Sequence, residues 1–201
     1  MSEQDVRQSL IDAATKLFLE KDFHNVSVRE LAAEASTTSA MVNYYFKSKN
    51  GLFEEMIKYQ CELIQQQVMD HIGESSATDY AGLMAAFQML YANNPNLAKF
   101  EVRSFMEESA FGNKYLQYMF QQERQLLLHT VREAEADFKP ANPRTDIEVE
   151  AARIMMVCCI VMGGVMEPAL KKYYGDEDYV KFKEAFSEAC GSMAHHYLFN
   201  K

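Results

Sequence analysis

The 201-residue sequence contains no tryptophan, only four prolines and only eight glycines. Because proline and glycine interrupt helices, their scarcity favours long helical segments. The sequence also lacks the alternation of apolar and polar residues that marks half-buried strands, and it has no internal repeat. A chain of this length can bury a substantial core in one or two domains. These features predict an all-α protein.

The four cysteines lack the spacing that metal sites and redox motifs require. Cys61, Cys158, Cys159 and Cys190 form no C-x-x-C pair and have no histidine at metal-ligand spacing. We therefore expect reduced, buried thiols, and we expect neither a metal ion nor a cofactor.

Long apolar runs are also missing. The longest, Ile154 to Met166, has 13 residues and is closed by Arg153 and Glu167, whereas a membrane span needs roughly 20 residues. We expect it to form a helix buried on most of its sides. The first twenty residues are charged throughout, unlike a secretory signal. These features predict a cytoplasmic protein that does not enter a membrane.

The net charge of −9 is unevenly distributed along the chain. Residues 1–50 contain six Lys/Arg and seven Asp/Glu, a net charge of −1, so residues 51–201 carry the other −8. Binding to DNA requires a local basic surface rather than a basic chain. The acidic total therefore does not exclude a nucleic-acid partner for the first fifty residues.

Two short helices are predicted close together near the N-terminus. Ser27 and Glu30 have the spacing of a capping box, which predicts a helix that begins directly after Ser27 and extends to about Ala35. The hydroxyl residues at 36–39 compete for backbone hydrogen bonds and end it. A third helix is expected at about 39–45. Two short helices joined by a tight turn form a helix-turn-helix.

The rest of the pattern predicts about nine helices in two domains. A second capping box at Thr145 and Glu148 marks a helix start. We expect a DNA-binding domain at 1–50 and a larger ligand-binding and dimerisation domain at 51–201. The expected helices cover about 3–21, 28–35, 39–45, 51–72, 79–93, 96–110, 113–137, 146–172 and 177–198.

Residues 9–57 resemble the DNA-binding domain of the TetR family of bacterial transcription regulators. The resemblance is carried by the run 26–32 and by an aromatic pair, Tyr45-Phe46, followed by the basic link 47–49 and Leu52. The family usually has glycine where Ser36 and Ala40 stand here. Ser36 in a left-handed conformation would cost about 1 kcal/mol.

The resemblance implies a repressor that is released from a palindromic operator by a small, mostly apolar effector. The sequence shows no phosphate-binding loop and no hydrolase or metalloprotease motif, so we expect no enzyme. A helical adaptor that never touches DNA is the alternative reading.

The third helix can present polar residues to the major groove, where Asn43 could read adenine. The hydroxyls of Ser27, Thr38 and Tyr45 would contact phosphate, although the first two also serve as caps and the tyrosines could simply pack. The complete predicted DNA-binding set is Ser27, Arg29, Thr38, Ser39, Ala40, Asn43, Tyr44, Tyr45, Lys47 and Lys49.

Methionines and aromatic residues of the second domain could line an effector cavity, or the same residues could pack as filled core. The candidate ligand-binding residues are Phe87, Leu90, Tyr91, Phe100, Arg103, Met106, Tyr115, Tyr118, Met119, Glu123, Met155 and Met162.

The last two helices are the predicted homodimer interface, because a short recognition helix needs a second copy to read a palindrome. The resemblance implies a four-helix bundle of two helices from each subunit. Gly163-Gly164 would let a partner helix approach closely. The predicted interface comprises Val161, Gly164, Val165, Phe182, Phe186, Ala189, Met193 and Tyr197.

Overall fold

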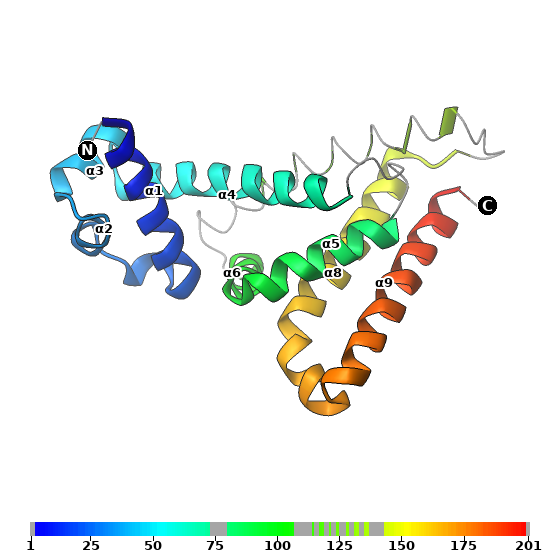
Figure 1. The fold of residues 1–201 in the computed structure, drawn as a ribbon. Coiled ribbons are helices and arrows are strands. Elements are labelled where there is room, and N and C mark those ends of the chain that lie inside the picture. The colour runs from blue at the N-terminus through cyan, green and yellow to red at the C-terminus, as the bar shows by residue number, and fades with distance from the viewer. Residues whose placement is uncertain are drawn as a thin grey trace. The chain divides into compact units, whose positions relative to one another are not determined.

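The computed structural model describes residues 3–72, 80–106 and 143–199, together with ten single positions between 107 and 142 (Figure 1). Every regular element in these ranges is a helix and none is a strand. The all-α prediction is therefore confirmed. The helix predicted at 113–137 and the last residues of the one predicted at 96–110 lie largely outside the described residues.

The observed helices begin and end within a few residues of the predicted bounds. They are α1 (Glu3–Glu20), α2 (Val28–Glu34), α3 (Ser39–Phe46), α4 (Lys49–Ile72), α5 (Tyr80–Asn93), α6 (Pro95–Met106), α8 (Asp146–Tyr174) and α9 (Asp176–Phe199), with a single 3₁₀ turn, η1, at Phe23–Asn25.

The chain packs into two compact units. The first combines residues 1–65 with 99–119, and the second combines 66–98 with 120–201. The first unit therefore extends beyond the expected DNA-binding domain at 1–50. The functional division of the chain at residue 50 stays a prediction.

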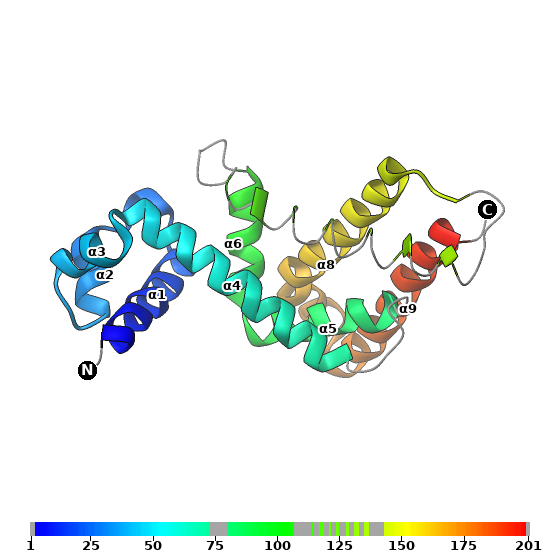
Figure 2. The same ribbon diagram turned by 90° about the horizontal axis from the view of Figure 1, so that it is seen from above.

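The core of the first unit is built from the apolar stripe of α1 and from one face of each following helix. In Figure 2, α2 and α3 lie beside α1, and α2 packs against both of the others. The ring of Phe18 stacks on Phe23, with ring centroids 5.4 Å apart, and meets the edge of Phe53 at 5.0 Å. The largest fully buried side chains here are Leu10, Phe18, Val26, Leu31, Val42, Leu52, Met56 and Ile57.

Both predicted capping boxes are present. The amide of Glu30 donates to the Ser27 hydroxyl at 3.1 Å, and the Ser27 amide donates back to the Glu30 carboxylate at 2.9 Å. Thr145 and Glu148 form the same reciprocal pair at the start of α8. Each box satisfies two amides that helix geometry leaves without partners.

The turn between α2 and α3 has a Schellman arrangement. The Thr37 amide donates to the Ala32 carbonyl at 2.8 Å, and the Ser36 amide donates to the Ala33 carbonyl at 3.1 Å. Ser36 has a φ of +53°, in the left-handed region that usually holds glycine at this position. The turn therefore keeps the left-handed conformation although serine stands at this position.

In the second unit, α8 runs antiparallel to α9, and both pack against α5 (Figure 1). By length and composition α8 could also cross a membrane, but one such helix is weak evidence because core helices pass the same test. Its most apolar window is 33 % buried. The expectation that this helix is buried on most of its sides is therefore wrong for the single chain, since one side of α8 faces outward.

Replacing Ser36 with glycine is expected to raise the free energy of unfolding by roughly 1 kcal/mol, because glycine adopts a positive φ without a steric penalty. The melting temperature should rise by about 2–4 °C. Thermal unfolding followed by circular dichroism measures the change. Ser39→Gly, three residues along in α3, is the matched control and should lower stability. An equal or lower melting temperature for Ser36→Gly would contradict the strain.

Candidate functional site

The sides of α3 differ sharply in burial. Val42 and Phe46 are buried in the core of the first unit, and Met41 and Tyr45 are half-buried against it. The outward side consists of Ser39, Ala40, Asn43 and Tyr44, all exposed, with Tyr44 at 60 %. No acidic residue lies in α3. This polar, uncharged side matches the predicted reading surface.

The N-terminal end of α3 differs in one detail from the expected cap. Thr38 occupies the N-cap position with an extended backbone, but its side chain makes no capping hydrogen bond. The residue is exposed, so its hydroxyl points to solvent rather than closing the helix.

The C-terminal end of α3 meets α4 in a tight link. Lys47 has a φ of +66°, and the Ser48 hydroxyl accepts the Gly51 amide at 3.1 Å, which caps the start of α4. A Cβ at Gly51 would overlap the carbonyl oxygen of Phe46. Gly51 lies within α4 and permits this close approach.

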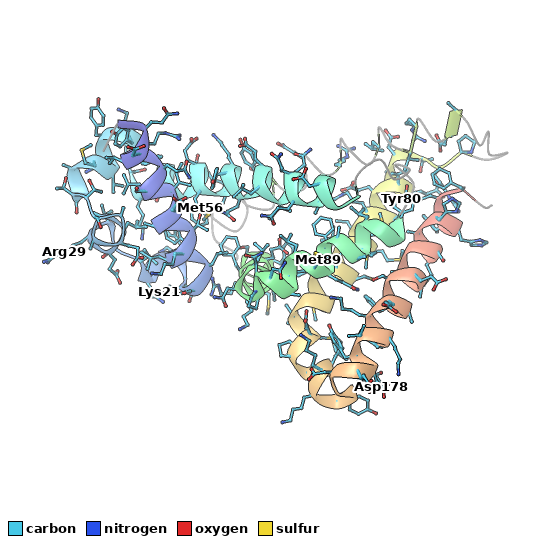
Figure 3. All side chains as sticks on the ribbon, in the orientation of Figure 1. Lys21, Arg29, Met56, Tyr80, Met89 and Asp178 are labelled. Atoms are coloured by element: carbon cyan, nitrogen blue, oxygen red, sulfur yellow. The ribbon has the colours of Figure 1, made fainter. Side chains whose placement is uncertain are left out.

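Near the outward side of α3, the acidic side chains of α2 are paired with lysines, whereas two basic side chains are not paired with an acid in the described ranges. Lys21 pairs with Glu30 at 3.3 Å, and Lys16 pairs with Glu34 at 2.6 Å. Hydrogen bonds from the backbone and hydroxyl of Ser27, helped by Lys21, lower the pKa of Glu30 to about 2. Within the described ranges, Arg29 and Lys47 have no ion-pair partner; Arg29 projects outward from α2 (Figure 3).

Lys49 is oriented differently from the prediction. Its ammonium donates to the carbonyls of Phe23 at 2.9 Å and Val26 at 2.8 Å, and lies 4.1 Å from the centroid of the Phe23 ring. Partial burial lowers the pKa of Lys49. Two of its three protons are therefore committed to the connection between α1 and α2. The phosphate contact proposed for Lys49 is corrected to a mainly structural role.

Comparison with known proteins bears on this domain most directly. Residues 10–56 match the family described as bacterial regulatory proteins, tetR family. The HTH-type transcriptional regulator BetI of Yersinia pestis (strain Pestoides F) is 30 % identical over 73 residues, which are 36 % of this chain and 37 % of BetI. A Bacillus subtilis (strain 168) protein named "Probable HTH-type transcriptional regulator YttP" is 41 % identical over 51 residues, 25 % of each chain.

Solved structures match over nearly the whole length. The transcriptional regulator FadR from Bacillus subtilis, in complex with stearoyl-CoA, has a TM-score of 0.69 at 18 % identity and covers 93 % of this chain and 96 % of its own. HlyIIR, a hemolysin II transcriptional regulator, has a TM-score of 0.59 at 19 % identity, with 100 % of both chains covered. At these identities the likeness shows the fold.

The N-terminal part of the chain is similar to the tetR family over residues 10–56. The chain spans 37 % of the length of BetI and 25 % of the length of YttP in these matches. The family likeness in sequence is therefore confined to the helix-turn-helix and its surroundings, as the motifs suggested. For the second unit, the likeness to the solved structures is one of fold.

The predicted effector residues are divided between the two compact units. Phe100, Arg103, Met106 and Tyr118 lie in the first unit, whereas Phe87, Leu90, Tyr91, Met155 and Met162 belong to the second. Tyr115, Met119 and Glu123 lie outside the described residues.

Arg103 has hydrogen-bond and ion-pair partners within the first unit. Arg103 donates to the carbonyls of Phe18 and Leu19 at 2.9 and 3.3 Å and pairs with Asp22 at 3.3 Å. It therefore caps the end of α1 rather than anchoring a ligand. Met106 is 79 % exposed.

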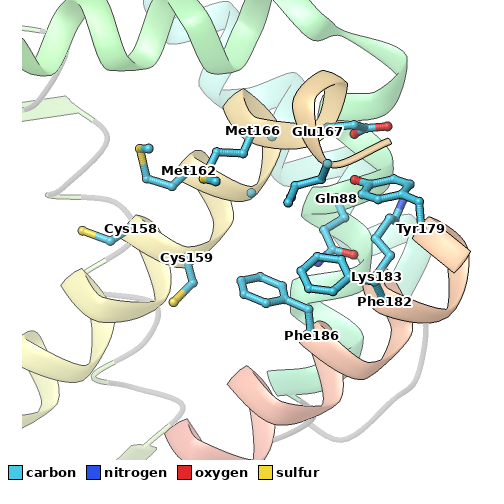
Figure 4. Close-up of a pocket in the computed structure, with 13 residues that line it drawn as sticks. Gln88, Cys158, Cys159, Met162, Met166, Glu167, Tyr179, Phe182, Lys183 and Phe186 are labelled. Atoms are coloured by element: carbon cyan, nitrogen blue, oxygen red, sulfur yellow. The ribbon is translucent and has the colours of Figure 1, made fainter. Parts of the chain in front are cut away.

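A cavity of about 370 Å³ lies elsewhere in the second unit, between α5, α8 and α9 (Figure 4). Of the predicted effector residues in the described ranges, only Met162 lines it. Cys158 and Cys159 also line it. Cys158 is exposed, and Cys159 and Cys190 are half-buried, so the expectation of buried thiols is wrong for these three. Cys61 is buried as expected, and all four thiols are free.

The predicted interface residues divide into two groups. Val165, Ala189, Met193 and Tyr197 are exposed or half-buried on the outer surfaces of α8 and α9. Phe182 and Phe186 instead stack on each other at 5.8 Å and line the cavity, and Val161 is buried.

Gly164 needs a correction as an interface residue. A Cβ there would lie 2.8 Å from the ring of Tyr91 in α5 of the same chain. The helix that approaches Gly164 closely is therefore α5 of the same subunit, and not a helix of a partner as predicted. Four residues along α8, Pro168 has no N–H with which to bond the Gly164 carbonyl.

Lys49→Met is expected to lower the free energy of unfolding by about 1–2 kcal/mol, because two carbonyls lose a charged donor. Denaturant unfolding measures the loss. Lys47→Met is the matched control: Lys47 is exposed and makes only one long contact, at 3.5 Å, to the Tyr44 carbonyl. Similar stability of the Lys49 variant and the wild type would show that these hydrogen bonds contribute nothing.

Proposed function

We propose that this chain is a transcription regulator that binds operator DNA as a homodimer, with α3 in the major groove. The observation that carries the proposal is the two-sided character of α3. Val42 and Phe46 fix the helix in the core, while Asn43 and Tyr44 project from its opposite side. A recognition helix requires this combination of a rigid mount and an exposed polar side.

Base reading is assigned to Asn43, whose amide can make a paired hydrogen bond with adenine. Ser39, Ala40 and Tyr44 would lie nearest to it on the same side. Phosphate contacts are assigned to Thr38, whose hydroxyl makes no capping bond, and to the cations Arg29 and Lys47. Ser27 is a further phosphate candidate. The Tyr45 hydroxyl is buried, so the phosphate contact predicted for Tyr45 is corrected to a packing role.

Homodimerisation supplies the second reading head. One short helix covers only a few base pairs, so a palindrome needs two copies related by a two-fold axis. The outer surface of α8 and α9 carries large apolar side chains that a single chain leaves exposed, among them Met193 and Tyr197. A second copy of the same surface would bury them.

The regulatory part of the proposal is a repressor released by a small, mostly apolar effector. An effector lowers operator affinity only if it binds the DNA-incompetent conformation more tightly. Support comes from the fold neighbour FadR, whose structure contains stearoyl-CoA. Contact with operator DNA places the protein in the bacterial cytoplasm, and regulation of this kind requires no enzymatic activity.

Operator binding is tested by selecting bound fragments from a genomic library and measuring gel shifts across a salt series. Affinity for the selected DNA should fall steeply as salt rises, because phosphate contacts release counterions. A helical adaptor would not retard DNA. Failure to bind any duplex at low ionic strength would remove the proposal.

Asn43→Ala should reduce the preference for the selected site over random DNA by about 1–3 kcal/mol, the discrimination of one bidentate base contact. Competition gel shifts measure the preference. Asn25→Ala, in the exposed turn before α2, is the control and should retain it. An unchanged preference in the Asn43 variant would rule out its base-reading role.

Met193→Asp should shift the protein toward the monomer in sedimentation experiments, because a carboxylate would be buried in the dimer without a partner. Met193 is 59 % exposed in the single chain, so its substitution should not unfold the subunit. Val180→Asp, also exposed and near the start of α9, is the matched control. A Met193→Asp dimer as tight as the wild type would exclude this surface as the interface.

A further inference from the structure

The cavity between α5, α8 and α9 has mainly apolar walls. Its lining includes Met162, Met166 and Leu170 of α8 together with Phe182 and Phe186 of α9. Figure 4 shows the two phenylalanine rings on the α9 side. At about 370 Å³, it lies at the small end of the range for ligand pockets. Such walls suit an aliphatic or aromatic body of modest size.

One buried amide interrupts these walls. Gln88 of α5 is only 7 % exposed, and its side chain extends toward the rings of Phe182 and Phe186 (Figure 4). Its carbonyl oxygen accepts the Ser187 hydroxyl at 3.0 Å. Among the residues that the structure describes, the hydrogen bond of the Gln88 side chain uses its carbonyl oxygen and not its amide nitrogen. A ligand oxygen in the cavity could therefore accept a hydrogen bond from this nitrogen.

The charged residues of the lining leave a positive excess. The Glu167 carboxylate is already paired with Lys171 at 2.7 Å. Burial, followed by the charge of Glu167, raises the pKa of Tyr179 to about 12, so this phenol is neutral. Lys183 lines the cavity from α9, is half-buried, and has no carboxylate within ion-pair distance in the described ranges.

We infer that this cavity binds a small apolar carboxylic acid, with its body among the methionines and phenylalanines and its carboxylate between Lys183 and Gln88. The claim that this ligand causes release from DNA rests on the proposed function. The claim that the cavity binds the ligand does not depend on that function. The site differs from the effector set expected from the sequence, with which it shares Met162 alone within the described residues.

A small molecule fits the cavity better than a second copy of the chain. A helix with its side chains is about 10–12 Å across and cannot enter a space of this volume. The Gln88 amide lies on the inner wall, whereas a partner helix could only cover the rim. An alkyl chain, one carbon wide, can reach this amide.

The test is calorimetric titration of the full chain, without DNA, with decanoate and with decylamine, which has the same chain length and the opposite charge. Decanoate should bind saturably, one per chain, and decylamine should bind at least roughly tenfold more weakly. Lys183→Gln should weaken decanoate binding roughly tenfold. Lys181→Gln, two residues along α9 and exposed, is the matched control and should not change it.

Gly163→Leu is the variant that fills the cavity. A Cβ at Gly163 meets only the ring of Phe186, at 3.8 Å, so a side chain there enters the cavity without a clash at its base. Leucine also favours the helix more than glycine does. Decanoate binding should fall below detection in this variant, while its helical content stays that of the wild type.

A second measurement uses the wild-type protein alone. Decanoate should slow the alkylation of Cys158 and Cys159 by iodoacetamide, because both thiols line the cavity, and should not alter the rate at Cys61 in the first unit. Equal decanoate affinity in wild type, Gly163→Leu and Lys183→Gln would overturn the inference, as would absent binding or unprotected thiols. If decanoate binds as expected but no operator is found, the site stands and the proposed function fails.

Discussion

The close contact between the end of α3 and the start of α4 constrains the whole N-terminal domain. Gly51 leaves room for the Phe46 carbonyl, the Ser48 hydroxyl caps the new helix, and Lys47 reverses the chain with a positive φ. With this link fixed, Phe46 and Val42 enter the core together and α3 cannot rotate about its own axis. The direction in which Asn43 and Tyr44 point is therefore set by contacts behind the helix rather than by the exposed residues themselves.

In the same domain, some charged side chains are bonded within the protein, and others remain able to contact a partner. Glu30 is held in the capping box and pairs with Lys21, and Glu34 pairs with Lys16 of α1. Lys49 donates to backbone carbonyls. Arg29 and Lys47 remain outside these networks in the described chain. A domain with almost no net charge can thus present a positive surface, because its acidic groups are used for internal bonding on other sides.

Features set by nearby residues could be predicted from the sequence. Both capping boxes depend on a spacing of a few residues, which the sequence displays directly. Lys49 and Arg103 could not be assigned correctly, because their carbonyl partners lie 23–26 and 84–85 residues away. Gly164 failed for the same reason: a glycine shows that something approaches closely but does not show that Tyr91 of the same chain is what approaches. The cavity was missed because its polar groups, Gln88 and Lys183, are ordinary helical surface residues when read in isolation.

Arg103 links two distant parts of the sequence. It belongs to α6, yet its guanidinium closes the last turn of α1 and pairs with Asp22 just beyond it, while its neighbour Phe100 lies in the same core as Phe53. An N-terminal fragment cut after the helix-turn-helix would retain all the residues proposed to touch DNA but would lose this clamp. Such a fragment should fray at the end of α1 and expose one edge of its core, so the DNA-reading head of this protein is not an autonomous module.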